Sequence, residues 1–196
     1  MRHKNYNDYI EFQKTKTNDP VRRKKWLNEE WDLKLNEFNR QFSKLISSDL
    51  IRKGQNSLCL GARTGQEVKS LHDLGLESIG IDIVPCEPLV IKGDIHKLEF
   101  EDNKFDFIYT NILDHSLYPE KMASEVFRTL KNDGIFFLQI QFGINQDEYT
   151  EYEVKNTNNV IEIFKDLKCI YANWIFNNRQ ITSHGMNFEF LFKKVV

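Results

Sequence analysis

Cysteine is scarce in this chain of 196 residues. Its three cysteines, Cys59, Cys86 and Cys169, are odd in number and scattered, and none has Cys-x-x-Cys spacing. Such a set argues against a disulfide framework and against a zinc site. The fold must therefore depend on an apolar core, which a chain of this length can bury.

Long apolar runs are also lacking. No segment approaches the roughly 20 consecutive apolar residues that span a bilayer. The N-terminus, MRHKNYNDYIEF, has no apolar region of the kind that directs secretion. Hydrophobic residues make up 40% of the chain and charged residues 29%, a balance typical of a globular domain. We therefore expect a cytoplasmic protein with no membrane partner.

The net charge is only −2, but the charges are unevenly distributed. Residues 1–53 carry 13 Lys and Arg against 8 Asp and Glu, so the remaining residues carry 14 against 21. A solvated basic helix before an acidic domain accounts for this division. The alternative is an N-terminal arm that contacts an anionic substrate. The density of basic residues is below that of a dedicated nucleic-acid surface, so no nucleic-acid partner is expected.

Residues 1–53 are predicted to form an N-terminal helical arm, and residues 54–196 a single compact domain. The first 18 residues are polar with isolated aromatics and predict a short helix and a loop. Asp19 followed by Pro20 is a typical helix start. The spacing after it predicts one helix to about Ile46, packed on the domain that follows, although a short two-chain coiled coil would show the same face. That face consists of Trp31, Leu35, Phe38, Phe42 and Leu45.

From residue 54 onward, apolar runs alternate with helical patterns, which is typical of a mostly parallel sheet with helices on both faces. The last two runs have no helix between them, so the last strand should run antiparallel. The predicted strands are Leu58–Gly61, Ser78–Val84, Val90–Lys92, Phe105–Thr110, Ile135–Gln141, Ile170–Phe176 and Asn187–Val195. The predicted helices are Gln66–Leu74, Pro119–Leu130 and Asn158–Leu167, with a turn at 131–134.

The segment Leu58–Val68, LCLGARTGQEV, carries the strongest functional signal. An apolar strand ends at Gly61, Gly65 follows, and a helical pattern begins at once. Such a turn brings backbone N–H groups close to a ligand. Asp82 ends the next apolar run, where a carboxylate can accept hydrogen bonds from a ribose diol. The turn and the acid together indicate a cofactor that contains a nucleoside.

With these motifs in this order, the chain resembles the class I S-adenosylmethionine-dependent methyltransferases, particularly the type 11 domain, over about residues 57–143. Gly93-Asp94-Ile95 is similar to the family's adenine-contacting step, and FEDNKFDFIYTNILDH at residues 100–115 resembles its fourth-strand signature. EVFRTLKNDGIFFLQI at residues 125–140 is similar to the helix, turn and fifth strand that follow. The resemblance implies an α/β, Rossmann-like, seven-stranded sheet and S-adenosylmethionine as the cofactor. It implies that the cofactor-binding residues are Gly61, Ala62, Arg63, Thr64, Gly65, Asp82, Ile83, Asp94, Ile95, Asn111 and Asp114.

Two departures from the family pattern concern this site. Where the family usually has an acid before the first glycine and a glycine within the loop, this chain has Cys59 and Arg63. Cys59 removes a partner for the methionine ammonium, whereas Arg63 adds a cation that either pairs with the methionine carboxylate or blocks the pocket. Only ten residues separate Asp82 from Gly93, too few for the usual crossover helix. The third strand should therefore be short, at the edge or imperfectly paired, which opens a flank that the N-terminal aromatic helix could cover.

Methyl transfer needs a general base only when the acceptor arrives protonated, as a hydroxyl does. His115 is the candidate base because it follows the fourth strand at the active face, and an unperturbed imidazole accepts a proton near neutral pH. Its alternative role is packing against the cofactor or capping the next helix. His184, in the polar loop of residues 177–187 with Arg179 nearby, is expected to contact the acceptor, unless the loop is a mobile hairpin tip.

Other reactions lack their usual residues. Residues 142–150 contain no Asn-Pro-Pro-aromatic sequence, which enzymes that methylate nucleobases or glutamine use. The Gly-x-Gly-x-x-Gly of a dehydrogenase is absent, and no uncommitted cluster of carboxylates predicts a metal. We therefore expect O-methylation of a small-molecule or sugar-type acceptor. Two alternatives remain, a non-catalytic partner or regulatory protein of this fold and an RNA methyltransferase that uses the basic arm.

Overall fold

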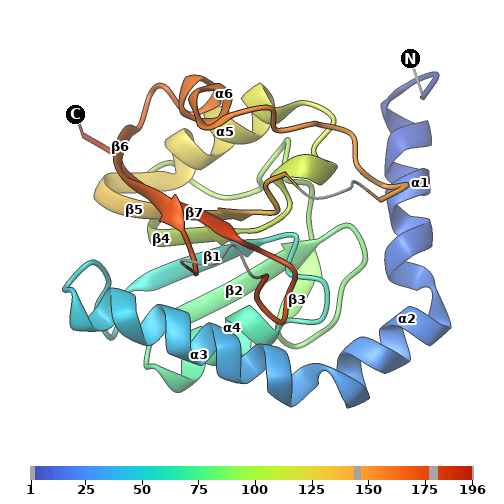
Figure 1. Ribbon diagram of the computed structural model, residues 1–196, viewed down its shortest axis with the longest axis horizontal. Coiled ribbons are helices and arrows are strands. Elements are labelled where there is room, and N and C mark those ends of the chain that lie inside the picture. The colour runs from blue at the N-terminus through green and yellow to red at the C-terminus, as the bar shows by residue number, and fades with distance from the viewer. Residues whose placement is uncertain (1–2, 144–146, 177–180, 196) are drawn as a thin grey trace.

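The described residues form a single sheet of seven strands with helices on both of its faces (Figure 1). The computed structural model describes residues 3–143, 147–176 and 181–195. Its strands are β1 (Asn56–Leu60), β2 (Glu77–Asp82), β3 (Val90–Lys92), β4 (Phe105–Thr110), β5 (Leu130–Ile140), β6 (Lys168–Trp174) and β7 (Phe188–Lys193). Its helices are α1 (Tyr6–Asn18), α2 (Pro20–Lys24), the π-helical turn η1 (Lys25–Glu29), α3 (Trp31–Ser47), α4 (Gln66–Asp73), the 3-10 turn η2 (Leu113–His115), α5 (Pro119–Thr129) and α6 (Thr157–Ile163).

The strands lie in the order β3-β2-β1-β4-β5-β7-β6. β7 runs antiparallel to β5 and β6, and every other neighbouring pair is parallel. This topology confirms the predicted Rossmann-like, mostly parallel sheet with an antiparallel last strand. The shortened connection after β2 leaves β3 three residues long at the edge of the sheet, as expected. The carboxyl ends of β1 to β4 therefore meet at one end of the sheet, where such folds bind ligands.

β5 begins earlier than the sequence pattern indicates. The turn predicted at residues 131–134 is wrong, because β5 starts at Leu130 and includes them. Asp133 does have a left-handed φ of 63°, as a turn residue would. However, its N–H donates to the Lys194 carbonyl at 2.9 Å, and the Lys194 N–H donates to the Gly134 carbonyl at 3.1 Å. These bonds to the last residues of the chain hold the segment in the sheet.

The N-terminal arm contains more helices than the sequence pattern predicts. The residues before Asp19 form the 13-residue helix α1, which the Asn5 side chain caps. The single helix predicted from Pro20 to about Ile46 is interrupted, because η1 separates α2 from α3. Asp19 caps α2 as expected and accepts the Arg22 N–H at 2.8 Å.

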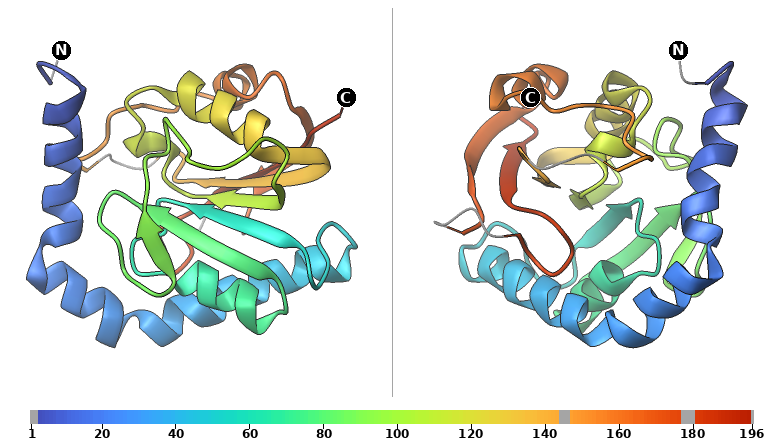
Figure 2. Two further views of the ribbon diagram at one scale, coloured as in Figure 1. Left: turned by 180° about the vertical axis from the view of Figure 1, so that it is seen from behind. Right: turned by 45° about the vertical axis from the view of Figure 1, so that its right-hand side comes forward.

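α3 packs on the sheet and on α4, as predicted. Phe38, Phe42 and Leu45 belong to a buried apolar cluster with residues of β1, β4, β5 and α4. Trp31 and Leu35, predicted on the same face, are only partly buried. A second apolar cluster fills the opposite face beneath α5 and α6. Neither cluster includes a residue of α1, which stands beside these layers at the end of the sheet (Figure 2).

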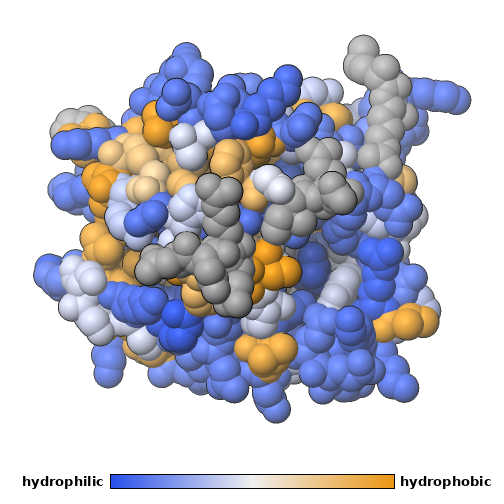
Figure 3. All heavy atoms as spheres, viewed as in Figure 1, coloured by the Kyte–Doolittle hydropathy of each residue, from blue (hydrophilic) through white to orange (hydrophobic). Residues whose placement is uncertain are grey.

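Hydrophilic side chains cover α1, α2 and α3 on the face shown in Figure 3, whereas hydrophobic ones gather over β6. Ile170 of β6 is 39% exposed. On this face the basic arm is therefore a solvated surface. Within the described ranges, no helix has the length and apolar character needed to cross a membrane.

Candidate functional site

The turn after β1 is tight, and three of its residues adopt left-handed conformations. Gly61, Arg63 and Gly65 have φ values of 69°, 47° and 89°. A Cβ atom on Gly61 would lie 2.3 Å from the Ile112 side chain, and one on Gly65 would lie 2.8 Å from the Leu89 Cβ. Both glycines are therefore required by backbone conformation and by space, and the turn leads directly into α4.

Asp82 holds this turn by hydrogen bonds and can still accept further hydrogen bonds from a ligand. The side chain is 8% exposed at the end of β2. One carboxylate oxygen accepts the Arg63 N–H at 3.1 Å and the other accepts the Val84 N–H at 2.9 Å. Burial raises the pKa of Asp82 above its ordinary value, although both N–H groups and the nearby Arg63 charge oppose this. Each oxygen retains an unused lone pair, which suits the two hydroxyls of a ribose.

Asp94 follows β3 and is held by the arm. The Tyr6 hydroxyl donates to its two carboxylate oxygens, each at 2.7 Å, and the His96 N–H donates to one of them at 2.8 Å. Burial alone would raise the pKa of Asp94, but the hydrogen bonds from His96 and Tyr6 outweigh it and leave the pKa below its usual range. The carboxylate predicted to recognise adenine is thus ionised and covered by α1.

Among the cavities at this end of the sheet, two share lining residues of the glycine turn. The smaller has a volume of about 60 Å³ and extends from the turn toward Asp94, with Tyr9 and Gln13 of α1 on its other side. The larger has a volume of about 330 Å³ and extends from the turn toward His184. Arg63 lines both cavities, so they form one continuous site.

The structure brings the sequence-predicted site residues together around this pair of cavities. Those that line the larger cavity are Gly61, Ala62, Arg63, Thr64, Asn111, Asp114, His115 and His184. Those that line the smaller cavity are Gly61, Arg63, Asp82, Ile83, Asp94, Ile95 and His115. Gly65 lines neither and serves the turn itself. Arg179, predicted near the acceptor, lies outside the described residues.

His115 presents one ring nitrogen to the site. Its Nδ1 lies 3.0 Å from the Tyr149 carbonyl oxygen, which assigns the proton to Nδ1. Its Nε2 therefore carries a lone pair, and the Lys16 ammonium lies 3.1 Å from it. Lys16 also pairs with Asp147 at 2.6 Å. Burial lowers the pKa of Lys16, and the Arg63 charge adds to that effect against the opposing Asp147 carboxylate.

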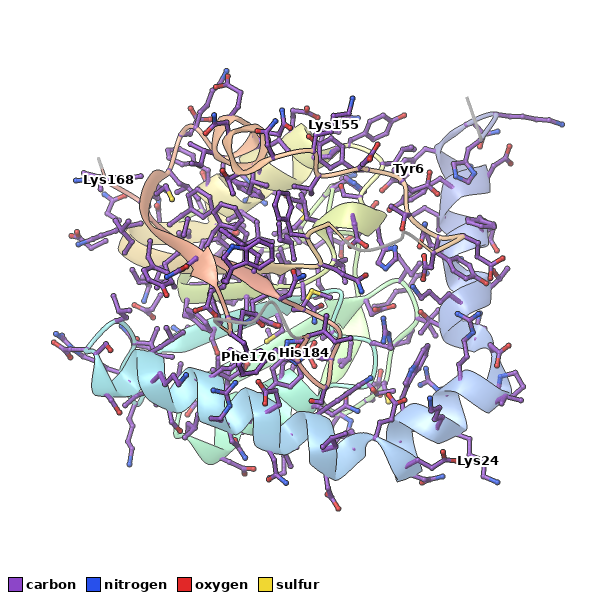
Figure 4. The ribbon with its side chains drawn as sticks, viewed as in Figure 1. Tyr6, Lys24, Lys155, Lys168, Phe176 and His184 are labelled. Carbon is purple, nitrogen blue, oxygen red and sulfur yellow. The ribbon has the colours of Figure 1, made fainter. Side chains whose placement is uncertain are left out.

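His184 occupies the far side of the larger cavity, next to α3 (Figure 4). Its ring stacks on Phe38 with centroids 4.5 Å apart, and its Nε2 lies 3.0 Å from the Gln139 side-chain oxygen. Its Nδ1 is buried and has no hydrogen-bond partner among the described residues. Burial lowers the pKa of His184 to about 3, so the ring is neutral near pH 7 and Nδ1 is a free acceptor.

Lys16, Lys34, Glu67 and Trp26 are among the residues at the site that were not predicted. Lys16 and Lys34 reach the larger cavity from α1 and α3, and Glu67 reaches it from the first turn of α4. Trp26 of η1 lies beneath the Arg63 guanidinium, 4.3 Å from the ring centroid. Only Glu67 had a local signal, an acid directly after the glycine turn, because the other three depend on how the arm folds back.

The arm covers the open flank differently from the expectation. The aromatic helix α3 packs on the sheet and on α4, whereas α1 crosses the flank beside β3. The Tyr9 hydroxyl donates to the His115 carbonyl at 2.8 Å, and the Gln13 amide donates to the Tyr149 carbonyl at 2.8 Å. Short polar contacts therefore hold α1 in place, a pattern that helix periodicity does not reveal.

Comparisons with known proteins agree with this geometry. Residues 58–138 match the model of a methyltransferase domain family, Methyltransf_11. A comparison with curated protein sequences found no match. The matched segment runs from β1 into β5 and contains the glycine turn, Asp82, Asp94 and His115.

Solved structures share the fold at low sequence identity. A Galdieria sulphuraria protein proposed to be a sarcosine dimethylglycine methyltransferase has a TM-score of 0.64 at 16% identity, covering 82% of this chain and 86% of that one. A Methanosarcina mazei S-adenosylmethionine-dependent methyltransferase has a TM-score of 0.62 at 15% identity, with coverage of 77% and 97%. Haemonchus contortus phosphoethanolamine N-methyltransferase 2, in complex with S-adenosylmethionine, has a TM-score of 0.60 at 16% identity, with coverage of 81% and 53%.

The donor set around the turn suits a nucleoside that carries an amino acid, since two acids lie along the smaller cavity and charges of both signs line the larger one. The matched domain uses S-adenosylmethionine as its methyl donor. Together with the turn and the acids, the match identifies residues 58–138 as a methyltransferase domain, in a fold shared with S-adenosylmethionine-dependent methyltransferases.

Proposed function

We propose that the enzyme methylates a hydroxyl group of a small-molecule or sugar-type acceptor and that His115 is the general base. One observation carries the proposal: His115 lines the larger cavity beside the glycine turn, and the bond between its Nδ1 and the Tyr149 carbonyl leaves the ring's lone pair on Nε2. The cavity volume of about 330 Å³ lies in the range of small-molecule sites.

In the proposed binding mode, the smaller cavity receives the adenosine and the larger one receives the amino-acid end of the cofactor together with the acceptor. Asp82 accepts from the ribose hydroxyls, and Asp94 and the Ile95 N–H contact the adenine. Gly61 to Gly65 contribute main-chain contacts. Asn111 and Asp114, which line the larger cavity, border the reacting groups.

When bound, the cofactor supplies a methyl carbon that its sulfonium already activates, so the chain has to align the acceptor, exclude water and remove a proton. The acceptor hydroxyl would displace Lys16 from Nε2 of His115 and give its proton to that nitrogen. Its oxygen would bond to the methyl carbon as the carbon–sulfur bond breaks, so that the sulfur departs as a neutral thioether. Asp147 retains Lys16 by their ion pair. The imidazolium keeps its Nδ1–H bond to Tyr149.

His184 supports a polyhydroxylated acceptor. The residue lines the larger cavity, and the Nδ1 of its neutral ring is buried with no partner among the described residues. A side-chain adjustment that exposes Nδ1 would let it accept a hydrogen bond from a second hydroxyl. A buried acceptor of this kind is disfavoured unless a ligand satisfies it.

Transfer of labelled methyl groups from S-adenosylmethionine to a fractionated extract tests the acceptor class. We expect label in the small-molecule fraction, as an ether. Label in the RNA or protein fraction, or on nitrogen, would contradict the proposal.

The role of His115 is tested on the purified acceptor with His115→Asn, which keeps a donor toward Tyr149 but removes the base. Its kcat should fall by about 10²- to 10⁴-fold, with the affinity for S-adenosylmethionine changed little. His72→Asn, on the exposed end of α4, is the matched control. A normal kcat in His115→Asn would exclude the general-base role.

A further inference from the structure

Glu67 is a buried carboxylate for which the proposed reaction has no role. It is the second residue of α4 and is 6% exposed. It lines the larger cavity together with Arg63 and Lys34. Within the described ranges its carboxylate makes no ion pair and no hydrogen bond to another side chain, and its one hydrogen bond is to its own backbone N–H. A buried acid in this state lacks a cationic partner.

The surroundings of Glu67 favour its uncharged form and give it no ion-pair partner. Burial raises its pKa to about 7 and is opposed by its own N–H and by the charges of Arg63 and Lys34, whereas Asp82 raises the pKa further. The nearby Cys59 and Tyr109 side chains are buried and neutral. Burying an unpaired carboxylate costs free energy, so such a group is expected where a ligand completes the site.

The neighbouring cations are already engaged. Lys34 forms an ion pair with Glu30 at 2.6 Å, and the Arg63 guanidinium lies over the Trp26 ring at 4.3 Å. Neither reaches within ion-pair distance of Glu67. The carboxylate is thus left for a cation that enters the cavity.

The other acids that line the larger cavity, Asp147 and Asp114, lie near other charged or titratable side chains. Asp147 pairs with Lys16 at 2.6 Å. Asp114 lies beside the proposed base, 3.9 Å from the Nε2 of His115. Cys59, which stands where the family usually has an acid, is a fully buried thiol and cannot pair with a cation. Glu67 is therefore the remaining carboxylate beside the glycine turn.

We infer that Glu67 binds the ammonium group of the methionine moiety of S-adenosylmethionine, in place of the acid that Cys59 replaces. The inference rests on the binding mode proposed above. It also matches the charges of the cavity to those of the ligand. Arg63 and Lys34 would then face the methionine carboxylate, and Glu67 would face the ammonium. A primary ammonium on the acceptor would have the same chemistry, and the experiment separates the two sources.

Calorimetry with two ligands tests the inference. S-adenosylmethionine carries the amino-acid group, whereas methylthioadenosine keeps the adenosine and the thioether and lacks it. Glu67→Gln should weaken S-adenosylmethionine by about 10- to 100-fold, the range of a hydrogen bond to a charged group, and should change methylthioadenosine by less than about twofold. Glu77→Gln, at the exposed start of β2, is the matched control and should change neither.

Proton release gives a second readout. A cation beside Glu67 lowers the pKa of the carboxyl group, so the wild type should release a fraction of a proton on binding S-adenosylmethionine near pH 7. The measured binding enthalpy should then depend on the ionisation enthalpy of the buffer, and this dependence should be lost in Glu67→Gln.

Three results would overturn the inference. Equal weakening of both ligands would make Glu67 a structural residue. Unchanged affinity for S-adenosylmethionine with a raised KM for the acceptor would assign the ammonium to the acceptor. Failure of the wild type to bind either adenosine ligand would refute the proposed binding mode as a whole, a result distinct from a defect confined to Glu67→Gln.

Discussion

Arg63 shows how a single residue departs from the family pattern without destroying the turn. Its φ of 47° is one that residues other than glycine adopt at a cost of about 1–2 kcal/mol. Two contacts offset this cost, the N–H bond to Asp82 and the stacking of the guanidinium on Trp26. The side chain therefore lies along the wall between the two cavities. The arrangement favours pairing with the ligand over blocking the pocket.

His184 predicts a pH dependence of stability at the residue scale. Its pKa is lowered to about 3 in the fold, against about 6.5 in an unfolded chain. Between these values the unfolded state binds more protons, so the free energy of unfolding should fall as the pH decreases below 6.5. From pH 7 to pH 5 this contribution is about 2 kcal/mol.

The check is chemical denaturation of the wild type and His184→Asn at both pH values. The variant should lose most of this decline, whereas His72→Asn, which removes an exposed histidine, should retain it. The wild type has to be compared with His184→Asn because Glu67 also affects the free energy of unfolding. The pKa of Glu67 is raised to about 7, so its contribution to that free energy changes with pH in the opposite direction. Parallel declines in the wild type and His184→Asn would show that His184 is not buried as described.

At the scale of elements, α1 acts as a cover that must shift before the cofactor binds. Its buried residues are Tyr9, Gln13 and Thr17, which face the loops at the carboxyl end of the sheet. The cavity beneath it, about 60 Å³, has room for a few water molecules and not for an adenosine. In the proposed binding mode, adenine reaches the Asp94 oxygens through this cavity only if the Tyr6 hydroxyl leaves them.

Tyr6→Phe should therefore strengthen the binding of S-adenosylmethionine. The variant removes a hydrogen bond to an ionised carboxylate that competes with the ligand, so the dissociation constant should fall by about tenfold, mostly through faster association. Stopped-flow binding measures both quantities. Tyr171→Phe, on the exposed strand β6, is the control. Weaker binding by Tyr6→Phe would mean that the hydroxyl contacts the ligand instead of competing with it.

Local patterns predicted most of the elements, and the exceptions have a common cause. The sheet order and the glycine turn follow from alternating apolar runs and from positions that require a left-handed backbone. The π-helical turn η1 does not follow from such patterns. In η1, the Trp26 carbonyl accepts a hydrogen bond from the Gln66 amide at 3.0 Å, and Gln66 belongs to another element. Lys16 and Tyr6 could not be placed for the same reason, since their partners lie far along the chain. Long-range polar contacts leave no periodic signal.

At the scale of the whole molecule, stability is unevenly distributed between the arm and the sheet. α3 contributes Phe38, Phe42 and Leu45 to one apolar cluster, and β4 and β5 contribute to both clusters. α1 contributes to neither, and it is held at loop surfaces by hydrogen bonds, an ion pair and aromatic contacts such as Phe12 on Tyr149. Removing α1 from the body therefore exposes less apolar surface than opening β4 or β5, which exposes the core.

Amide hydrogen exchange should resolve this division. Without ligand, the amides of α1 should exchange through local opening at a free energy well below that of global unfolding, whereas those of β4 and β5 should exchange only on global unfolding. Saturating S-adenosylmethionine should slow exchange in α1 and in the turn from Gly61 to Gly65, because the ligand bridges them. α6, which packs on the far face of the sheet, should not respond beyond the general gain in stability. If α1 were as protected as β5 before ligand is added, it would be an integral part of the core, and the cofactor would have to enter by another route.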